Sequence, residues 1–451
     1  MSGSVPGRPA PPADPASLPD PLPIVPFGGP VDATVRPPGS KSLTNRALLA
    51  AALASGRSRL TGVLFADDTD AMLGCVEALG AGVTVDREAR VVEVEGTGGR
   101  LAEGPVELHA ALSGTTSRFV AATLALGAGP FRLDGGEPLR ARPMGPVLDA
   151  VRQLGATVTE EGEPGHLPVT VSGGAVGIGP GGERPVVALP GDISSQFVSG
   201  LLLAGACLPG GLRVELTTDP VSRPYLDMTV AVMAAFGAHA HADGPRAYVV
   251  EPGGYRPADY HVEPDASAAS YLFAVAAVCG GRVRVEGLGE ASLQGDVRFV
   301  DHLEAMGCTV RRAADAIEVE GGPLHGIEAD FEPISDTAQT VAAVATFAEG
   351  PTRITGIGFI RRKETDRIAA VVTELQRAGV SAVEEDDGFT VTPAPIRPAV
   401  IRTYDDHRMA MSFTLLGLRT PGIEIADPGC VAKTFPDFFD VIETLRPRST
   451  P

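Results

Sequence analysis

The sequence predicts an α/β fold of six similar units, packed as two domains of three units each. Six Ala-rich helical segments, apolar on nearly every face, recur about every 70 to 80 residues. Between them lie amphipathic helices that end in glycine and lead into short alternating strands. With 451 residues, 44% of them hydrophobic, the chain is too long for one core and can bury two.

Each apolar helical segment has a serine or an aspartate at its start. These residue types accept hydrogen bonds from the unpaired N–H groups of a first helical turn. A helix that is apolar all round is buried, so only its first turn can remain accessible. The six segments are expected to begin near Lys41, Ser113, Ser194, Asp265, Ser335 and Asp405.

The second recurring element is an amphipathic helix whose C-terminus needs a residue that tolerates positive φ. A sixth copy, FPDFFDVIETL, is imperfect because it ends at Arg446 and Pro447 without a glycine. Alternating strands such as RVVEVEG and FTVTP complete the units. The glycines that end the other five copies are Gly80, Gly155, Gly237, Gly307 and Gly379.

Composition shifts suggest the domain boundaries. Residues 1–22 are Pro-rich without an apolar segment, which predicts a disordered tail and neither a signal peptide nor a membrane span. The Gly/Pro-rich EPGGYRPAD precedes the second half, and the early strand near Val31 can pair with that half. We therefore expect one domain of residues 39–256 and a discontinuous one of residues 23–38 and 257–451.

The repeats alone would also fit a solenoid. Against a solenoid, the polar and charged residues gather at the starts of the helices and spare the surfaces of the repeats. This distribution predicts that six helix N-termini converge on one cleft, where free N–H groups and the helix dipoles favour an anion.

The composition excludes several classes of function. A net charge of −19 and a pI near 4.9 disfavour nucleic-acid binding and a membrane-surface role. Five scattered cysteines without CxxC spacing and eight histidines without ligand spacing predict neither a disulfide framework nor a metal site. We expect a cytoplasmic monomer in which any anionic ligand is held by a local cluster of cations.

Only three of the 37 basic residues are lysines, namely Lys41, Lys363 and Lys433. Arginine and lysine are not interchangeable where geometry or proton transfer matters. Each lysine lies in a motif with other reactive side chains, respectively PGSKSLTNR, RRKETDR and AKTFPDFF. RRKETDR is expected to open an amphipathic helix, and Lys433 to lie just ahead of the last helix. Helix caps and surface salt bridges are the simpler interpretation of any one such motif.

The motifs together resemble those of the 3-phosphoshikimate 1-carboxyvinyltransferase (EPSP synthase) family, over roughly residues 25 to 445. PGSKSLTNRALLAAAL, GTTSRF, ARPMGPVLDAV, SSQFVSGLLLA, SRPYLDMT, SDTAQT, KETDRIAA, DDHRMAM and AKTFPDF occur in the family's order. The resemblance implies a two-domain inside-out α/β barrel with three βαβαββ-type repeats per domain and an active site in the interdomain cleft. It also implies enolpyruvyl transfer from phosphoenolpyruvate to the 5-hydroxyl of shikimate 3-phosphate by addition and elimination, without a cofactor, in the shikimate pathway to chorismate and the aromatic amino acids.

The resemblance implies a role for each matching residue. The implied catalytic residues are Lys41, which lies near the enolpyruvyl group, Asp336, which takes the 5-hydroxyl proton, and Glu364, which handles the methylene proton. The implied ligands of shikimate 3-phosphate are Lys41, Ser42, Arg46, Ser194, Ser195, Gln196, Ser222, Tyr225, Asp336 and Lys363. Those implied for phosphoenolpyruvate are Lys41, Gly114, Arg118, Arg142, Gln196, Arg367, Arg408 and Lys433.

Two positions depart from the family's pattern. Leu112 and Phe359 stand where the family usually has asparagine, which removes two polar contacts near phosphates. The departures leave open shifted affinities or a related phosphorylated cyclic alcohol as acceptor. Two rival functions are those of the enolpyruvyl transferase that acts on UDP-N-acetylglucosamine, which usually has SGAKN in place of PGSKS, and of a non-catalytic anion-binding homologue. An RNA-end-processing enzyme of similar architecture is disfavoured by the net charge of −19.

Overall fold

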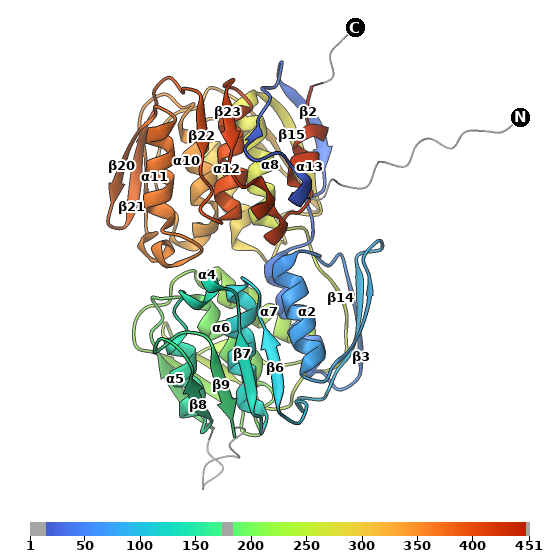
Figure 1. Cartoon of the computed structure of the whole chain (residues 1–451). Coiled ribbons are helices and arrows are strands. Elements are labelled where there is room, and N and C mark those ends of the chain that lie inside the picture. The colour runs from blue at the N-terminus through green and yellow to red at the C-terminus, as the bar shows by residue number, and fades with distance from the viewer. Residues whose placement is uncertain (1–14, 174–183, 448–451) are drawn as a thin grey trace, which may run out of the picture.

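The computed structural model describes residues 15–173 and 184–447, which form two lobes (Figure 1). One hydrophobic core runs from Leu43 to Val262 and belongs to the first lobe. A second core combines Ile24 and Val31 with apolar side chains from Ala266 to Leu445. In the described residues no helix is both long and apolar enough to cross a bilayer.

The first lobe contains three four-stranded sheets. In spatial order these are β14 (Asp259–His261), β3 (Arg57–Thr61), β5 (Val91–Glu95) and β4 (Gly82–Asp86); β6 (Val106–His109), β7 (Phe131–Asp134), β9 (Val169–Ser172) and β8 (Thr157–Glu160); and β10 (Val186–Leu189), β11 (Leu212–Leu216), β13 (Ala247–Val250) and β12 (Ala240–Ala242). Its helices are α1 (Lys41–Leu53), α2 (Asp67–Ala78), α3 (Gly114–Thr123), α4 (Glu137–Arg140), α5 (Gly145–Gln153), α6 (Ser195–Gly205) and α7 (Arg223–Ala235), with the 3₁₀ turn η2 (Leu124–Leu126).

The second lobe has two four-stranded sheets and one of three strands. They are β2 (Val31–Val35), β15 (Gly281–Glu286), β17 (Ala316–Glu320) and β16 (Thr309–Arg312); β18 (Glu328–Asp330), β19 (Thr352–Thr355), β21 (Gly388–Thr392) and β20 (Ser381–Glu385); and β1 (Leu22–Pro23), β23 (Ile423–Ile425) and β22 (Ala399–Ile401). The helices are α8 (Ala266–Cys279), α9 (Phe299–Ala305), α10 (Ala338–Ala345), α11 (Arg367–Arg377), α12 (His407–Gly417) and α13 (Phe438–Thr444). The 3₁₀ segments are η1 (Pro15–Ser17), η3 (Gly295–Arg298), η4 (Glu332–Thr337), η5 (Gly358–Arg362) and η6 (Pro428–Lys433).

The units have the expected βαβαββ order. In the clearest one, β6 and β7 pair in parallel across α3, and β9 pairs antiparallel with both β7 and β8. A parallel pair needs such a crossover, whereas the antiparallel pair is joined directly. The predicted α/β fold of six repeats is confirmed, with the last repeat incomplete because α13 is followed by no hairpin within the described residues.

A strand lies just before each of the two points where the chain crosses between the lobes. β2 pairs in parallel with β15 of the second lobe, as expected for the early strand, and β14 pairs in parallel with β3 of the first lobe. The boundary expected between residues 256 and 257 is therefore wrong by several residues, because residues 259–261 belong to a first-lobe sheet. The chain crosses between lobes at residues 36–40 and 262–265, which are hydrogen-bonded to each other through Ser40 N and Glu263 O (2.9 Å) and through Asp265 N and Pro38 O (2.8 Å).

The end of the predicted tail is ordered against the second lobe. Leu22 and Pro23 pair with Ile425 and Glu424, so β1 supplies an antiparallel partner to the incomplete last sheet. Residues 15–17 form η1, which packs near η6. The expectation of disorder is thus wrong for residues 15–22, because η1 packs near η6 and Leu22 pairs with an otherwise unpaired edge of β23. Residues 1–14 of that expected tail lie outside the described residues.

The six apolar helices are buried along their lengths. The side chains of Ser40, Ser113, Ser194, Asp265 and Asp406 cap α1, α3, α6, α8 and α12. The remaining helix differs from the prediction: Ser335 lies within η4, and α10 begins at Ala338 without a side-chain cap. The glycines that follow the amphipathic helices all have positive φ, for example +107° at Gly80 and +84° at Gly379.

RRKETDR does not open a helix as expected. The first two arginines of the motif end η5 at Arg362, and the third, Arg367, begins α11 with Asp366 as its cap. The Asp366 carboxylate accepts a hydrogen bond from Ala369 N at 3.0 Å, which fixes the helix start four residues later than Lys363. Lys363 and Glu364 therefore lie in the turn before α11, where they can point away from the helix.

Candidate active site

A solvent-connected cleft lies between the lobes, at the starts of the buried helices, and forms the main cavity of the structure. Side chains from the first turns of α1, α3, α6 and α7 meet those from η4, α12 and the turn before α11. The structure brings together here all the sequence-predicted site residues except Arg46 and Lys433. Those lining the cavity are Lys41, Ser42, Gly114, Arg118, Arg142, Ser194, Ser195, Gln196, Ser222, Tyr225, Asp336, Lys363, Glu364, Arg367 and Arg408.

Arg46 lies behind the cavity. Its guanidinium donates to Thr229 Oγ1 and Ser42 O, both at 2.8 Å, and to Tyr225 O at 3.2 Å. The side chain is only 1% exposed, and burial lowers its pKa to about 10. Arg46 therefore joins α1 to α7 and supports the cavity wall from behind.

Lys433 lines a small adjoining pocket that shares Arg142 and Glu364 with the main cavity. Its ammonium donates to Leu112 O at 2.9 Å and lies 3.6 Å from Glu364 Oε1. The contact uses the carbonyl of Leu112, so the absence of an asparagine side chain there does not remove it. At the other departure, the ring of Phe359 lies 5.6 Å from the Lys363 ammonium, a cation–π distance.

The first-lobe wall presents hydroxyls and two helix N-termini. Ser194 caps α6, and Ser222, with φ of +53°, precedes α7. Free N–H groups at two helix starts with neighbouring hydroxyls make a site for a phosphate-like anion. Beside them Arg118 donates to Gln196 Oε1 at 2.6 Å, and its pKa is lowered to about 9 by burial and by Arg142. A bound anion would offset that cost.

Asp336 is held by three cations of the second lobe. Its carboxylate contacts Lys363 Nζ at 2.5 Å, Arg408 Nη2 at 2.7 Å and Arg367 Nη1 at 3.1 Å. Burial alone would raise its pKa, but the positive charges of Arg408, Lys363 and Arg367 hold the pKa well below its usual range. Burial lowers the pKa of Lys363, and Asp336 opposes that change.

Glu364 connects the lobes. It contacts Arg367 Nη2 at 2.7 Å within the second lobe and Arg142 Nη1 of the first lobe at 3.4 Å. Burial works to raise its pKa, but Arg367, Arg142 and Lys433 hold the pKa well below the usual value. Asp406, the cap of α12, anchors Arg367 through a 2.7 Å contact to its Nε.

Sequence reasoning missed three acidic residues at the site. Asp68 lies 3.0 Å from Lys41 Nζ and 3.9 Å from Lys433 Nζ. Asp296 accepts from Tyr225 Oη at 3.0 Å. Asp406 was visible in the DDHRM motif, but its bond to Arg367 was not. For Asp68 and Asp296 no local pattern signals the role, because their partners come from distant segments.

The arrangement suits two anions and acid–base chemistry. Cations from both lobes surround a cavity that is also lined by three carboxylates, Asp68, Asp336 and Glu364, and the pKa values of Asp336 and Glu364 depend on those cations. In residues 15–173 and 184–447 no group of three or more His, Cys, Asp or Glu side chains could hold a metal ion.

Solved structures of enolpyruvyl transferases share this architecture. EPSP synthase from Acinetobacter baumannii matches with a TM-score of 0.78 and 27% identity, over 94% of this chain and 98% of that one. The enolpyruvyl transferase NikO from Streptomyces tendae, at 21% identity and a TM-score of 0.71, shows the shared fold over 93% of this chain and 95% of that one. Fold and site together define a protein of the two-domain enolpyruvyl transferase class.

The family follows from the sequence comparisons. The model of the EPSP synthase (3-phosphoshikimate 1-carboxyvinyltransferase) family matches residues 26–442. A 3-phosphoshikimate 1-carboxyvinyltransferase from Nostoc punctiforme is 46% identical over 422 residues, which cover 93% of this chain and 98% of the relative. A 3-phosphoshikimate 1-carboxyvinyltransferase from Methanoculleus marisnigri is 45% identical over 417 residues, which cover 92% of this chain and 97% of the relative. The chain belongs to the EPSP synthase family.

Proposed function

We propose that this chain transfers the enolpyruvyl group of phosphoenolpyruvate to the 5-hydroxyl of shikimate 3-phosphate, in the cavity between the lobes. The observation that supports this most strongly is the pair of carboxylates, Asp336 and Glu364, set among cations of both lobes on one cavity. The reaction joins two polyanions, which fixed cations can hold side by side.

In the proposed complex, shikimate 3-phosphate lies against the first lobe. Its phosphate binds the hydroxyls of Ser194, Ser195 and Ser222 at the starts of α6 and α7, where the helix dipoles add to the hydroxyl donors. Lys363 binds the hydroxyl-bearing side of the shikimate ring, next to Asp336. The remaining proposed contacts are Lys41, Ser42, Gln196 and Tyr225, with Arg46 acting from behind the wall.

Phosphoenolpyruvate is proposed to bind where the two lobes meet. Its carboxylate and phosphate pair with arginines, which suit planar and bidentate anions. Gly114 lets the anion and Arg142 approach the α3 start closely, since it has no side chain. The proposed ligands are Lys41, Gly114, Arg118, Arg142, Gln196, Arg367, Arg408 and Lys433.

The proposed chemistry is an addition followed by an elimination. Asp336 accepts the 5-hydroxyl proton as that oxygen bonds to C2 of the enolpyruvyl group, and Glu364 donates a proton to C3. In the second step Glu364 takes a proton back from C3 while the bond from C2 to the phosphate oxygen breaks and phosphate leaves. Lys41 stabilises charge at the reacting centre.

Substrate binding prepares Glu364 for this role. In the free protein Arg142, Arg367 and Lys433 keep its pKa well below the usual value. When the anions of phosphoenolpyruvate bind the same cations, less positive charge acts on the carboxylate, and its pKa rises. The carboxyl can then hold the proton that C3 needs. The reaction thus uses a pKa that depends on the presence of substrate.

The test is phosphate release from purified protein given shikimate 3-phosphate and phosphoenolpyruvate. Lys41→Met and Asp336→Ala should each lower kcat by about a hundredfold or more, the scale of a lost acid or base group. Arg353→Gln, which removes a solvent-exposed charge on β19 that is paired with Glu328 and Glu385, is the matched control. Folded protein without turnover would overturn the assignment, and turnover with UDP-N-acetylglucosamine instead would select the rival acceptor. Near-normal rates in Lys41→Met and Asp336→Ala would exclude Lys41 and Asp336 from the mechanism.

We further infer that the enzyme works as a monomer in the cytoplasm and supplies chorismate and aromatic amino-acid biosynthesis. Five free cysteines, two of them buried, suit a reducing compartment. The net charge of −19 favours small anionic substrates held by local cations over nucleic acid.

A further inference from the structure

The hydroxyl of Tyr225 lies between two carboxylates of the opposite lobe. It is 3.0 Å from Asp296 Oδ2 and 3.4 Å from Asp336 Oδ2. A phenol has one hydrogen to donate, so it can satisfy only one of two ionised carboxylates. The second contact is favourable only when that carboxyl carries a proton of its own. The three groups therefore form a chain with a place for one additional proton.

The two carboxylates have opposite surroundings. Asp336 is surrounded by Lys363, Arg367 and Arg408, whereas Asp296 receives hydrogen bonds only from the neutral hydroxyls of Ser267 and Tyr225 among the described residues. Within residues 15–173 and 184–447, the other oxygen of Asp296, Oδ1, has no hydrogen-bond partner. Asp296 is 4% exposed, so water screens its charge little.

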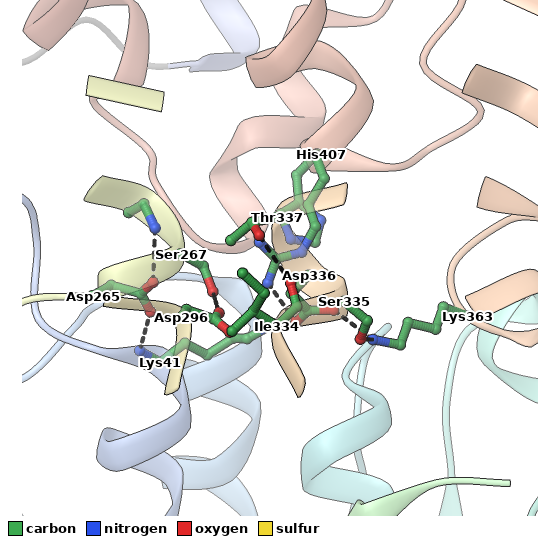
Figure 2. Close-up of polar contacts among 12 residues, drawn as sticks. Lys41, Asp265, Ser267, Asp296, Ile334, Ser335, Asp336, Thr337, Lys363 and His407 are labelled. Atoms are coloured by element: carbon green, nitrogen blue, oxygen red, sulfur yellow. Dashed lines mark hydrogen bonds and ion pairs between the residues drawn. The ribbon is translucent and has the colours of Figure 1, made fainter. Parts of the chain in front are cut away.

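Asp296 borders a second, smaller cavity, which shares Lys41, Ser42, Tyr225 and Arg408 with the main cavity. Figure 2 shows Ser267 bonded to Asp296 near Asp336, with Asp265 and Lys41 close by. The titratable and charged groups around Asp296 and its cavity are Tyr225 from α7, Asp336 from η4, Arg408 from α12, Asp265 from the α8 cap, Tyr271 from α8 and Lys41 from α1. Burial and the charge of Asp336 together raise the pKa of Asp296 to about 6.

We infer that Asp296 is a positioning residue that receives, through Tyr225, the proton that Asp336 removes from the acceptor hydroxyl. Protonated Asp336 gives its hydrogen to the phenol oxygen while the phenol gives its own hydrogen to Asp296 Oδ2. One O–H bond forms and one breaks at the phenol, and the net result is a neutral Asp296 and an ionised Asp336. The inference rests on the proposed role of Asp336.

The transfer has a clear electrostatic advantage. A proton on Asp336 would leave three cations facing a neutral carboxyl, which is costly in a buried site. A proton on Asp296 leaves that cluster intact and removes a poorly solvated negative charge. Storing the proton on Asp296 therefore lowers the cost of removing it from the hydroxyl, and the step is reversible along the same path.

The test is the pH dependence of kcat at saturating substrates. kcat reports the bound complex, whereas kcat/KM also contains the free substrates, whose phosphates titrate near pH 6. For the unmodified enzyme we expect kcat to fall as the pH drops through about 6. In Asp296→Asn this fall should be lost or move to lower pH, and kcat at pH 7.5 should decrease about tenfold, less than for a direct acid or base group. Tyr225→Phe combined with Asp296→Asn should lower kcat no further than Tyr225→Phe alone.

Ser267→Ala supplies a second variant with an opposite sign. The Ser267 hydroxyl stabilises ionised Asp296, so its loss raises the pKa of Asp296 and should move the fall in kcat to higher pH. Asp301→Asn is the control, since Asp301 lies five residues further on and pairs with exposed Arg312. Circular dichroism would verify folding. If Asp296→Asn does not fold, the pH profile of kcat in Ser267→Ala alone tests the inference.

The results separate this inference from the proposed function. If Asp336→Ala is inactive but both Asp296→Asn and Ser267→Ala keep the unmodified pH profile, the relay is wrong and the role of Asp336 stands. If Asp336→Ala keeps normal turnover, the proposed function of Asp336 itself fails. A uniform decrease of kcat in Asp296→Asn without any change of pH profile would show a structural role only and would overturn the inference.

Discussion

Replacing Gly114 by alanine should weaken the use of phosphoenolpyruvate by displacing Arg142. A methyl group on Gly114 would lie 2.7 Å from Arg142 Nη2, 2.8 Å from Cζ and 2.9 Å from Nη1. Unstrained contacts between such atoms are about 3.5 Å, so the guanidinium must retreat by roughly 0.7 Å. The group that moves is the far end of a flexible side chain, and we therefore expect the protein to fold normally.

The size of the effect follows from that displacement. A misplacement of 1 Å at a positioning group can cost about a hundredfold, so about 0.7 Å predicts roughly a 25-fold loss in kcat/KM for phosphoenolpyruvate. The loss should appear mainly in KM, because Arg142 is proposed to bind this substrate before and during the reaction. The KM for shikimate 3-phosphate should change little, since its proposed ligands on α6 and α7 do not include Arg142.

Initial rates measured while each substrate is varied in turn would give both KM values. Gly145→Ala is a matched control at the start of α5, because a methyl group there meets only Gly165 Cα at an ordinary 3.8 Å among the described residues. An unchanged KM for phosphoenolpyruvate in folded Gly114→Ala would refute the reasoning, as would an equal rise in both KM values.

Two further predictions concern stability and use urea unfolding. Because folding raises the pKa of Asp296 from 3.8 to about 6, this carboxyl favours the folded state most below about pH 4, and its contribution is lost as the pH rises through about 6, where the ionised carboxylate costs about 3 kcal/mol. Asp296→Asn should remove most of that loss at pH 7.5 and gain little at pH 4, and equal changes at both pH values would contradict this. Arg46→Met should lower the unfolding free energy by about 3 kcal/mol because Thr229 Oγ1, Ser42 O and Tyr225 O each lose the hydrogen bond from its guanidinium; an unchanged midpoint would count against it.

The local signals in the sequence predicted most of the fold. Serine and aspartate caps and glycines with positive φ act within a few residues, and the structure has them at nearly every expected helix end. The start of α10 was misplaced because Pro333 and Ile334 form a 3₁₀ turn with a kink, and Ser335 lies inside it. Hydroxyl type alone does not show whether a first turn is α or 3₁₀.

Long-range pairings could not be predicted in the same way. β14 pairs with β3, about 200 residues earlier in the chain, and nothing in the three residues of β14 indicates that partner. The contact between Tyr225 and Asp296 likewise joins positions 71 residues apart, in different lobes. Arg46 stands in a motif of reactive residues, but its helical position turns it toward α7 instead of the cavity. Such outcomes depend on how helices pack, which local patterns do not determine.

The contacts that join the lobes use the residues proposed to bind substrate. Arg142 with Glu364, Lys433 with the Leu112 carbonyl, and Tyr225 with Asp336 each combine one partner from each lobe. An anion placed among these cations competes with the carboxylates for them, so it changes the attraction between the lobes as it binds. Binding and lobe position are therefore thermodynamically linked: the free energy by which bound substrate shifts the lobe equilibrium equals the free energy by which the lobe arrangement changes substrate affinity.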